Sequence, residues 1–473
     1  MSVPKLVSPS PRALRLLLVW TGALTFALVL PTLSACEPES SGEDTVVPGS
    51  FPLRIERSEL IPTVATVTWE LDGATPQQAW VKVGLETPGE IQVAVDLSRG
   101  PPYSTTVLGM KPEQIYKIEV QVETDEGPVA SDQVTMQTGA ENSGISALTL
   151  EDIDPARTNG GFLVTSQMAL PAVALILDRD GAPVWWYEPA RSDMLGRVRI
   201  SQDGQRVLMG EIYLEPDEDA ELVSVSLDGT REERIPMPYR HHDFVELPDG
   251  TLGYLAYDPR NVDGELIPGD RIMELRPDGS TVEVYNIWDH HEPDSDTIDG
   301  PLQTWPHANA LDYDPIEDDW LVSFLVMNMI VRVDRSTGEE QWALGGADST
   351  LATAKGDTNF FQGQHGMELL DDSLLVFING VGAQPESRVV EVQIDAEQGL
   401  AETVWSWQPE PDLSCPILGD VHRFEDGNTL VTFSFNGVVY EIDASDAPVW
   451  KLSTGIGGPL SYMTWMSTLQ DPG

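Results

Sequence analysis

Histidines are the residues of this sequence whose spacing is best suited to chemistry. The chain holds 7 of them, and four open similar segments in which an apolar stretch runs into an acidic turn: His242 (HHDFVELPDG), His307 (WPHANALDYDP), His365 (QGQHGMELLDD) and His422 (DVHRFEDG). The intervals between their residue numbers are 65, 58 and 57. Histidines at matched places in a repeat are expected to lie close together in the fold.

Converging imidazoles permit two chemistries. Neutral imidazole is a good ligand for a transition metal, or one ring is a nucleophile while its neighbours donate hydrogen bonds to a developing anion. The neighbours favour the second, because Asn309 lies two residues past His307 and points the same way along a strand. Asp243 is the candidate carboxylate beside a histidine of the set. A third interpretation makes each histidine a core residue bonded to backbone.

The histidines lie within a repeat that begins near residue 150. Asp-Gly pairs start at residues 180, 203, 228, 249 and 278 between β-rich runs, and glycine accepts the positive φ of a tight hairpin turn. Such hairpins pair into four-stranded units of about fifty residues, the size of a propeller blade. Residues 150–473 therefore predict a six-bladed β-propeller, closed by a strand near residues 461–466. The first residue of each innermost strand is expected to face the central funnel.

Residues 51–140 predict a small β-sandwich ahead of the propeller, so the fold class is all-β. Five short β-rich runs are separated by Gly, Pro and Asp turns at the interval of sandwich strands, namely residues 63–71, 80–84, 91–95, 105–108 and 116–122. Leu108, Pro112 and Tyr116 resemble the tyrosine-corner region of fibronectin type III domains. We expect a spacer or partner-binding module here, without chemistry.

The N-terminal residues predict export. Residues 16–33 are almost uncharged, follow Lys5, Arg12 and Arg15, and end on Leu-Ser-Ala before Cys36. This pattern predicts a lipoprotein signal peptide (1–35), a lipidated Cys36 and a flexible tether (36–50) rich in Ser, Pro and acid. The protein is thus expected outside the cytoplasm, lipid-anchored to the cell envelope on the periplasmic or surface side. A retained transmembrane helix is the alternative.

Composition limits the partners and the means of stabilisation. The chain has 77 acidic and 27 basic residues, a net charge of −50, which argues against nucleic acid and against docking on anionic lipid. We expect a solvated acidic surface; calcium binding in loops 215–221 and 289–300 is the alternative, although neither has the spacing of a known calcium loop. Of the 2 cysteines, Cys415 would be left without an internal disulfide partner after cleavage.

At its histidine segments the chain resembles the bacterial aryl sulfotransferases, which move a sulfuryl group from an aryl sulfate to a phenol without the nucleotide donor PAPS. The matching motifs are His241-His242-Asp243, Trp305-x-His307-x-Asn309 with Tyr313-Asp314-Pro315, Trp342-x-Leu344-Gly345, and Gln364-His365-Gly366. The resemblance covers nearly all of the mature chain. It implies a small N-terminal β-domain, a six-bladed propeller and an active site in the funnel.

Carried over to this chain, the resemblance makes His365 the nucleophile that becomes a sulfohistidine. His242 and His307, with Asn309, would bind the sulfuryl oxygens and stabilise the leaving phenolate, and His241 and Asp243 are further candidates for substrate binding. The expected substrates are a small aryl sulfate and a phenol. No cofactor and no metal are expected.

One residue departs from the family pattern. The family's sulfate-binding arginine lies eighteen residues past the histidine, which is Leu325 here, and leucine lacks the guanidinium fork that suits sulfuryl oxygens. Arg240, Arg388 and Arg423 are candidate substitutes. The alternative function is therefore a catalytically impaired propeller acting as a binding or surface-assembly module. A metal-dependent hydrolase or lyase is a third.

Overall fold

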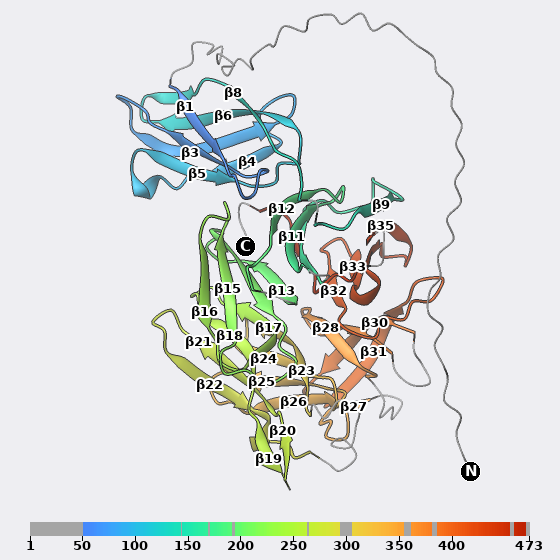
Figure 1. The fold of residues 1–473 in the computed structure, drawn as a ribbon. Coiled ribbons are helices and arrows are strands. Elements are labelled where there is room, and N and C mark those ends of the chain that lie inside the picture. Colours follow the sequence, from blue (N-terminus) through green and yellow to red (C-terminus); the bar gives the residue numbers. More distant parts are fainter. Residues whose placement is uncertain are drawn as a thin grey trace, which may run out of the picture. The chain divides into compact units, whose positions relative to one another are not determined.

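The computed structural model describes residues 51–469 except 143, 169–170, 192–193, 263, 294–304, 354–360, 381–385 and 455–457. The predicted signal peptide, Cys36 and the tether lie outside the described residues, as does most of the acidic loop 289–300, and those interpretations stay predictions. Among the described residues, no helix has the length and hydropathy needed to cross a membrane. The described chain is all-β, with three short 3-10 helices, η1 (Leu97–Arg99), η2 (Ile287–Asp289) and η3 (Ser434–Asn436) (Figure 1).

The first part of the described chain forms two antiparallel sheets that share one apolar core. One sheet contains β1 (Leu53–Arg57), β2 (Ala65–Trp69) and β5 (Tyr103–Val107); the other contains β3 (Pro76–Gly84), β4 (Ile91–Ala94), β6 (Ile115–Thr124), β7 (Gly127–Ala130) and β8 (Val134–Gln137). Each of the five predicted β-rich runs coincides with a strand. Alternate residues of β6 are buried, and the Tyr116 hydroxyl accepts a hydrogen bond from the Lys111 N–H at 2.8 Å.

The rest of the described chain forms six antiparallel sheets that are each built on four strands, and two of them carry a fifth strand at an edge. The first three comprise β10 (Phe162–Gln167), β11 (Val173–Asp178), β12 (Pro183–Tyr187) and β36 (Thr464–Met466); β13 (Leu195–Ile200), β14 (Arg206–Glu211), β15 (Glu221–Ser226) and β16 (Glu232–Pro236); and β17 (Arg240–Glu246), β18 (Leu252–Tyr257), β21 (Asp270–Leu275) and β22 (Thr281–Asn286). A hairpin of β19 (Arg260–Val262) and β20 (Glu265–Ile267) is inserted between β18 and β21.

The last three sheets follow the same order. They comprise β23 (Ala308–Asp314), β24 (Asp319–Phe324), β25 (Met329–Asp334) and β26 (Glu340–Gly345); β28 (Gln364–Leu369), β29 (Ser373–Ile378), β30 (Arg388–Asp395) and β31 (Leu400–Trp407), with β27 (Ala352–Thr353) beside β31; and β32 (Asp420–Arg423), β33 (Thr429–Phe433), β34 (Val438–Ile442) and β35 (Pro448–Thr454), with β9 (Leu148–Asp152) on the outer edge. The first strands contact one another in order, β13 with β17, then β23, β28 and β32.

The turn and closure predictions are confirmed. The glycines of the five Asp-Gly pairs all have positive φ between 63° and 82°, as a tight turn requires. The predicted closing strand is β36, which pairs with β10 and brings the end of the chain into the first sheet. The sequence did not predict that β9 extends the sixth sheet by pairing with β35.

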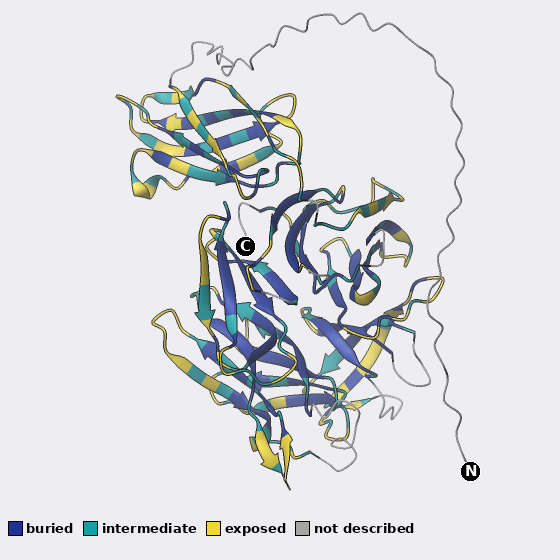
Figure 2. Cartoon of the chain, viewed as in Figure 1, coloured by how far each residue is buried: buried dark blue, intermediate teal, exposed yellow. Residues whose placement is uncertain are grey.

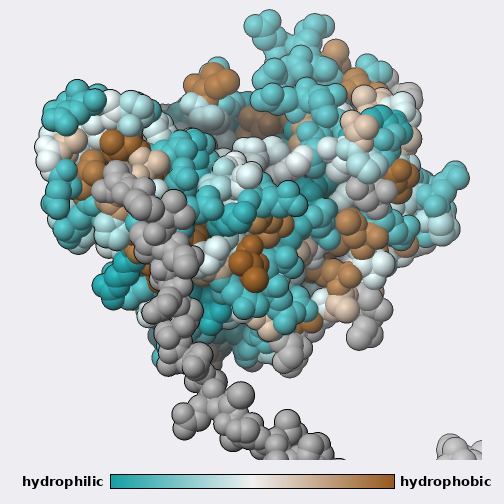
Figure 3. Space-filling view, turned by 90° about the horizontal axis from the view of Figure 1, so that it is seen from above, coloured by the Kyte–Doolittle hydropathy of each residue, from teal (hydrophilic) through white to brown (hydrophobic). Residues whose placement is uncertain are grey.

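Many residues of the sheet strands are buried (Figure 2), and apolar side chains from neighbouring sheets pack together as the core. Leu255 of the third sheet packs in one cluster with Val322 of the fourth, and Leu175 of the first with Val439 of the sixth. The outer surface is different: hydrophilic side chains cover most of the face seen in Figure 3, with apolar residues in small separate groups. This agrees with the solvated acidic surface expected from a net charge of −50.

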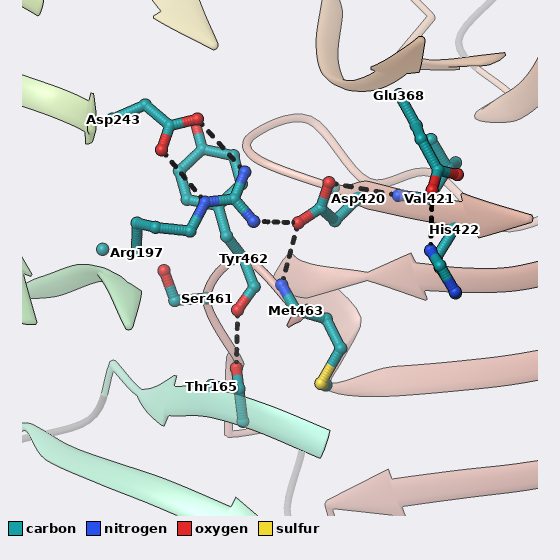
Figure 4. A network of polar contacts seen from close by, with 12 residues as sticks. Thr165, Arg197, Asp243, Glu368, Asp420, Val421, His422, Ser461, Tyr462 and Met463 are labelled. Atoms are coloured by element: carbon teal, nitrogen blue, oxygen red, sulfur yellow. Dashed lines mark hydrogen bonds and ion pairs between the residues drawn. The ribbon is translucent and has the colours of Figure 1, made fainter. Parts of the chain in front are cut away.

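A buried ion network joins the first strands of three sheets. Arg197 of β13 is bonded through Nε and Nη2 to the carboxylate of Asp243 at 3.0 and 3.1 Å, and through Nη1 to Asp420 of β32 (Figure 4). Its guanidinium also lies 4.3 Å from the ring centre of Tyr462. Burial by itself raises the pKa of Asp243, but the two neighbouring arginines outweigh it, so that this pKa lies below its usual value.

Removing Arg197 should destabilise the fold strongly. In Arg197→Leu, two buried carboxylates lose their shared cation, and breaking a buried pair in this way costs about 3–5 kcal/mol. Chemical denaturation at pH 7 measures the loss. The matched control is Arg54→Ala, which removes the exposed Arg54–Glu56 pair and should change stability by less than about 1 kcal/mol. Equal effects of the two substitutions would contradict the importance of the network.

A candidate active site of clustered histidines

Four histidines from three neighbouring sheets lie together where the first strands begin. His241 and His242 belong to β17, His307 immediately precedes β23, and His365 belongs to β28. The ring centres of His242 and His307 are 5.0 Å apart, and those of His241 and His242 are 5.1 Å apart. His242 and His365 are each 5% exposed, whereas His241 is fully buried behind them. The predicted convergence is therefore observed for His242, His307 and His365.

β-Bulges and unusual φ values determine the orientation of these histidine side chains. The pairing register shifts between Arg240 and Phe244 in β17, between Ala308 and Ala310 in β23, and between Gln364 and Met367 in β28. Such bulges redirect side chains beside functional sites. His242 and His307 also have positive φ, 47° and 59°, a conformation that residues other than glycine rarely adopt and that concentrates at functional sites.

The orientation of His365 is set by Asn379, the residue that follows β29. The Asn379 Nδ2 donates to the carbonyls of Cys415 and Leu418 at 2.6 and 2.7 Å, so its Oδ1 must face the His365 Nδ1, with which it is in contact. A carbonyl oxygen only accepts. The neutral His365 ring therefore carries its proton on Nδ1 and leaves the lone pair on Nε2, the form that a nucleophile needs.

The clustered imidazoles are held in their neutral form. Burial lowers the pKa of His365 to about 4. Burial, with the neighbouring histidines, lowers the pKa of His307 to about 3 and that of His242 well below its usual value. At pH 7 these rings therefore offer lone pairs and N–H donors but no formal positive charge.

The other predicted site residues are placed around this cluster. Asn309 is fully buried, and its Nδ2 donates to the Gln364 carbonyl at 2.7 Å, next to His365. Asp243 is also fully buried, and its carboxylate is engaged by Arg197. The ring of His241 stacks on Tyr257, 4.0 Å between centres. All three side chains are fully buried, and their part in substrate binding stays a prediction.

His422 has different neighbours from the other three histidines. Its Nδ1 contacts the Glu368 Oε1 at 2.7 Å (Figure 4). Its ring stacks on Trp465 with centres 5.2 Å apart. The expectation that it joins the cluster as the counterpart of His365 is wrong. Gly419, which immediately precedes β32, lies closer to His365 in the fold, because its carbonyl accepts a hydrogen bond from the N–H of the next residue, Gly366, at 3.1 Å.

Leu325 borders the site, and the three candidate arginines have other contacts. The Leu325 N–H donates to the His307 carbonyl at 2.9 Å. Arg240 donates to the carbonyls of Glu211 and Glu221, and Arg423 pairs with Glu391 at 2.7 Å. Arg388 is the first residue of β30, and its backbone lies opposite that of Ile378 in β29, the neighbour of Asn379.

Sequence reasoning missed Asn379 and Asp270. Each stands at the end of a buried strand on the side of the histidines: Asn379 follows β29, and Asp270 opens β21. The available signal was a polar residue at the end of a buried strand. Such residues recur in several sheets, and their presence does not by itself indicate which histidine they contact. Within the residues that the structure describes, no group of three or more His, Cys, Asp or Glu side chains has a geometry suited to a metal ion.

Comparison with known proteins agrees with the motifs. The family model Arylsulfotransferase (ASST) matches residues 149–454, more than half of the chain. The chain belongs to the arylsulfotransferase family. A relative, arylsulfate sulfotransferase AssT of Escherichia coli O6:H1 (strain CFT073), is 27% identical over an alignment of 289 residues, with a coverage of 45% of this chain and 47% of the relative. The match therefore spans about half the length of this curated family member.

Solved structures give weaker similarities. A streptogramin B lyase matches with a TM-score of 0.38 and 13% identity over 64% of this chain and 86% of its own. A catalytically inactive virginiamycin B lyase from Staphylococcus aureus, with quinupristin, matches with a TM-score of 0.39 and 12% identity over 68% and 97%. With TM-scores this low, they support no conclusion about the fold or function of this chain.

Replacing His365 should make the fold less sensitive to acid. His365 titrates at about pH 4 when folded and near 6.5 when unfolded. Between these values only the unfolded chain takes up the proton, so stability present above pH 6.5 is lost as pH falls toward 4. His365→Asn removes this loss. Its unfolding free energy should fall from pH 7 to pH 4 by about 3 kcal/mol less than that of the wild type, measured by denaturant titration. An identical pH dependence would contradict a neutral, buried His365.

Proposed function

We propose that this family member is an aryl-sulfate sulfotransferase that moves a sulfuryl group from an aryl sulfate to a phenol through a covalent sulfohistidine at His365. The observation that carries the proposal is the contact between Asn379 and the His365 Nδ1, which leaves a neutral Nε2 lone pair at a cluster of imidazoles. Family membership supports the reaction class.

The two half-reactions use the same nitrogen. In the first, the His365 Nε2 forms an N–S bond as the aryl O–S bond breaks, and the electron pair leaves with the phenolate. The sulfated ring keeps its proton on Nδ1, where the Asn379 carbonyl stabilises the cationic ring. In the second, a phenol oxygen attacks the sulfur, and the imidazole leaves as a neutral ring. Most of the rate would come from positioning and from donors to the sulfuryl oxygens.

The turn between β24 and β25 supplies an apolar wall suited to an aromatic ring. Leu325 and Val326 are partly exposed there, and their N–H groups donate to the carbonyls of His307 and Pro306 at 2.9 and 3.2 Å. Leucine in place of the family's arginine removes a cation from this wall. The sulfuryl oxygens would then be held by an imidazole N–H donor of His307, and the His242 N–H would meet the phenolic oxygen.

We also propose that the six sheets are blades of a propeller whose funnel holds the site. The sequential four-stranded sheets, the closing pair of β36 with β10 and the contacts between successive first strands support it. The two N-terminal sheets would form a fibronectin-III-like sandwich, which the bond between the Tyr116 hydroxyl and the Lys111 N–H supports.

The proposal predicts phenol-dependent release of 4-nitrophenol from 4-nitrophenyl sulfate by the protein starting at residue 50. His365→Asn should abolish this release, because no nucleophilic nitrogen remains. The release is followed by absorbance with and without an acceptor phenol. The control is His290→Asn, a histidine outside the cluster that stacks on Tyr285, which should keep wild-type turnover.

Turnover by His365→Asn at the wild-type rate would contradict the proposal. Absence of release from a panel of aryl sulfates with several phenols would favour the second function, a binding or surface-assembly propeller. The observation in favour of that second function is Leu325 at the position where the family resemblance places an arginine.

A further inference from the structure

Behind the clustered rings lies a buried line of three titratable groups. The His242 Nδ1 is 2.9 Å from the His241 Nδ1, and the His241 Nε2 is 3.0 Å from the Asp270 Oδ1. All three side chains are almost inaccessible to water, with exposures of 5% for His242, 0% for His241 and 1% for Asp270. The line runs from the site into the interior of the third sheet.

The innermost contact joins two polar atoms that depend on each other. Within the described part of the chain, the His241 Nε2 and the Asp270 Oδ1 are buried without an aligned hydrogen bond, yet they face each other at 3.0 Å. A small rotation of the carboxyl group aligns them, and burying either atom without a partner would be costly. The other oxygen, Oδ2, accepts the Ala308 N–H at 2.5 Å.

We infer that Asp270, His241 and His242 form a proton relay that protonates the leaving phenolate and later takes the proton from the acceptor phenol. This inference rests on the proposed function of His365. It assigns general acid–base catalysis to His242, whose ring meets the substrate, and a positioning and proton-storing role to His241 and Asp270.

The relay has two states that use the same contacts. In the loaded state, Asp270 is a neutral acid that donates to the His241 Nε2, the His241 Nδ1–H donates to the His242 Nδ1, and the His242 Nε2 carries the proton facing the substrate. In the discharged state, Asp270 is a carboxylate that accepts from the His241 Nε2–H, and the His241 Nδ1 accepts from the His242 Nδ1–H. The His242 Nε2 then holds a lone pair.

Protons balance over one turnover. As the aryl O–S bond breaks, the His242 Nε2–H goes to the phenolate oxygen, the His241 Nδ1 proton moves to His242, and the Asp270 proton moves to His241. As the acceptor oxygen attacks the sulfohistidine, its proton goes to the His242 Nε2 and the transfers reverse. One proton leaves and one returns, so no external acid is needed.

The surroundings favour proton storage on Asp270. Burial raises the pKa of Asp270, and His241 and the Ala308 N–H only partly offset that effect, so the surroundings shift this group toward its neutral acid form. His242 faces His307, His365 and Arg240. These neighbours, together with burial, disfavour an imidazolium at His242, which favours storage of the proton on the carboxyl group.

Leaving-group dependence tests the relay. Asp270→Asn can still receive the Ala308 N–H and donate to the His241 Nε2, but it has no proton to give. For phenyl sulfate, whose phenol is a poor leaving group, kcat/KM of the donor should fall about 100-fold or more. For 4-nitrophenyl sulfate, which leaves readily without an acid, it should fall less than about 10-fold. In a two-step reaction this parameter reports the first half-reaction alone.

A matched control and a second readout separate chemistry from structure. Glu340→Gln alters another His–carboxylate contact, a half-buried one 3.0 Å from the His291 Nε2, and should leave the ratio between the two donors unchanged. Infrared spectroscopy at pH 7 should show the C=O band of a protonated buried carboxyl group that is missing in Asp270→Asn. His241→Gln, which interrupts the line without changing Asp270, should give the same donor discrimination if Asp270→Asn unfolds.

The outcomes distinguish failure of the proton relay from failure of the proposed sulfuryl transfer through His365. Equal losses for both donors, or the absence of the infrared band from the wild type, would overturn the relay while leaving transfer through His365 intact. If the wild type turns over neither donor, the proposed function fails, and the infrared band still decides whether Asp270 stores a proton.

Discussion

The site depends on one interaction, the buried salt-bridge network of Arg197 with Asp243 and Asp420. Asp243 directly follows His242, and Asp420 lies against the residue after His365: a Cβ on Gly366 would come within 2.3 Å of an Asp420 carboxylate oxygen. One guanidinium thus binds the strand that carries His242 and the strand that packs against Gly366 (Figure 4). Glycine at position 366 is required for this close approach, which explains the His-Gly pair in physical terms.

Neutrality of the histidines is the second constraint. An aryl sulfate is an anion, and a chain with a net charge of −50 repels it at long range. Salt screens exposed charges beyond about 8–10 Å, so binding must rest on short-range donors inside the site. Rings held neutral by burial serve both as N–H donors and as nucleophile, whereas protonated rings would lose the lone pair that attacks sulfur.

The sequence revealed the repeat more readily than the geometry of the site. Asp-Gly turns and alternating strands predicted the sheets, since turn chemistry and side-chain period are local properties. The convergence of His242, His307 and His365 followed from the repeat. The orientation of their side chains could not be predicted from the repeat, because it depends on bulges and positive φ values that no local sequence pattern indicates.

Long-range partners account for the rest of what the sequence left undecided. Asn379 contacts His365, which is 14 positions earlier, and Asp270 contacts His241, which is 29 positions earlier. His422 resembled His365 only in its flanking residues. In the fold, contacts with Glu368 and Trp465 give His422 a different environment. Similar sequence windows do not place side chains alike when one strand contains a bulge and the other does not.

The central claim is that the sulfuryl group passes through the His365 Nε2. The most direct measurement mixes excess protein with an aryl sulfate in the absence of acceptor, stops the reaction rapidly, and locates the added group by mass spectrometry of peptides. We expect one sulfuryl group on the peptide containing His365, formed in step with a burst of phenol and discharged when an acceptor phenol is added. A burst with the label on another residue, or phenol release only when donor and acceptor are both present, would contradict it.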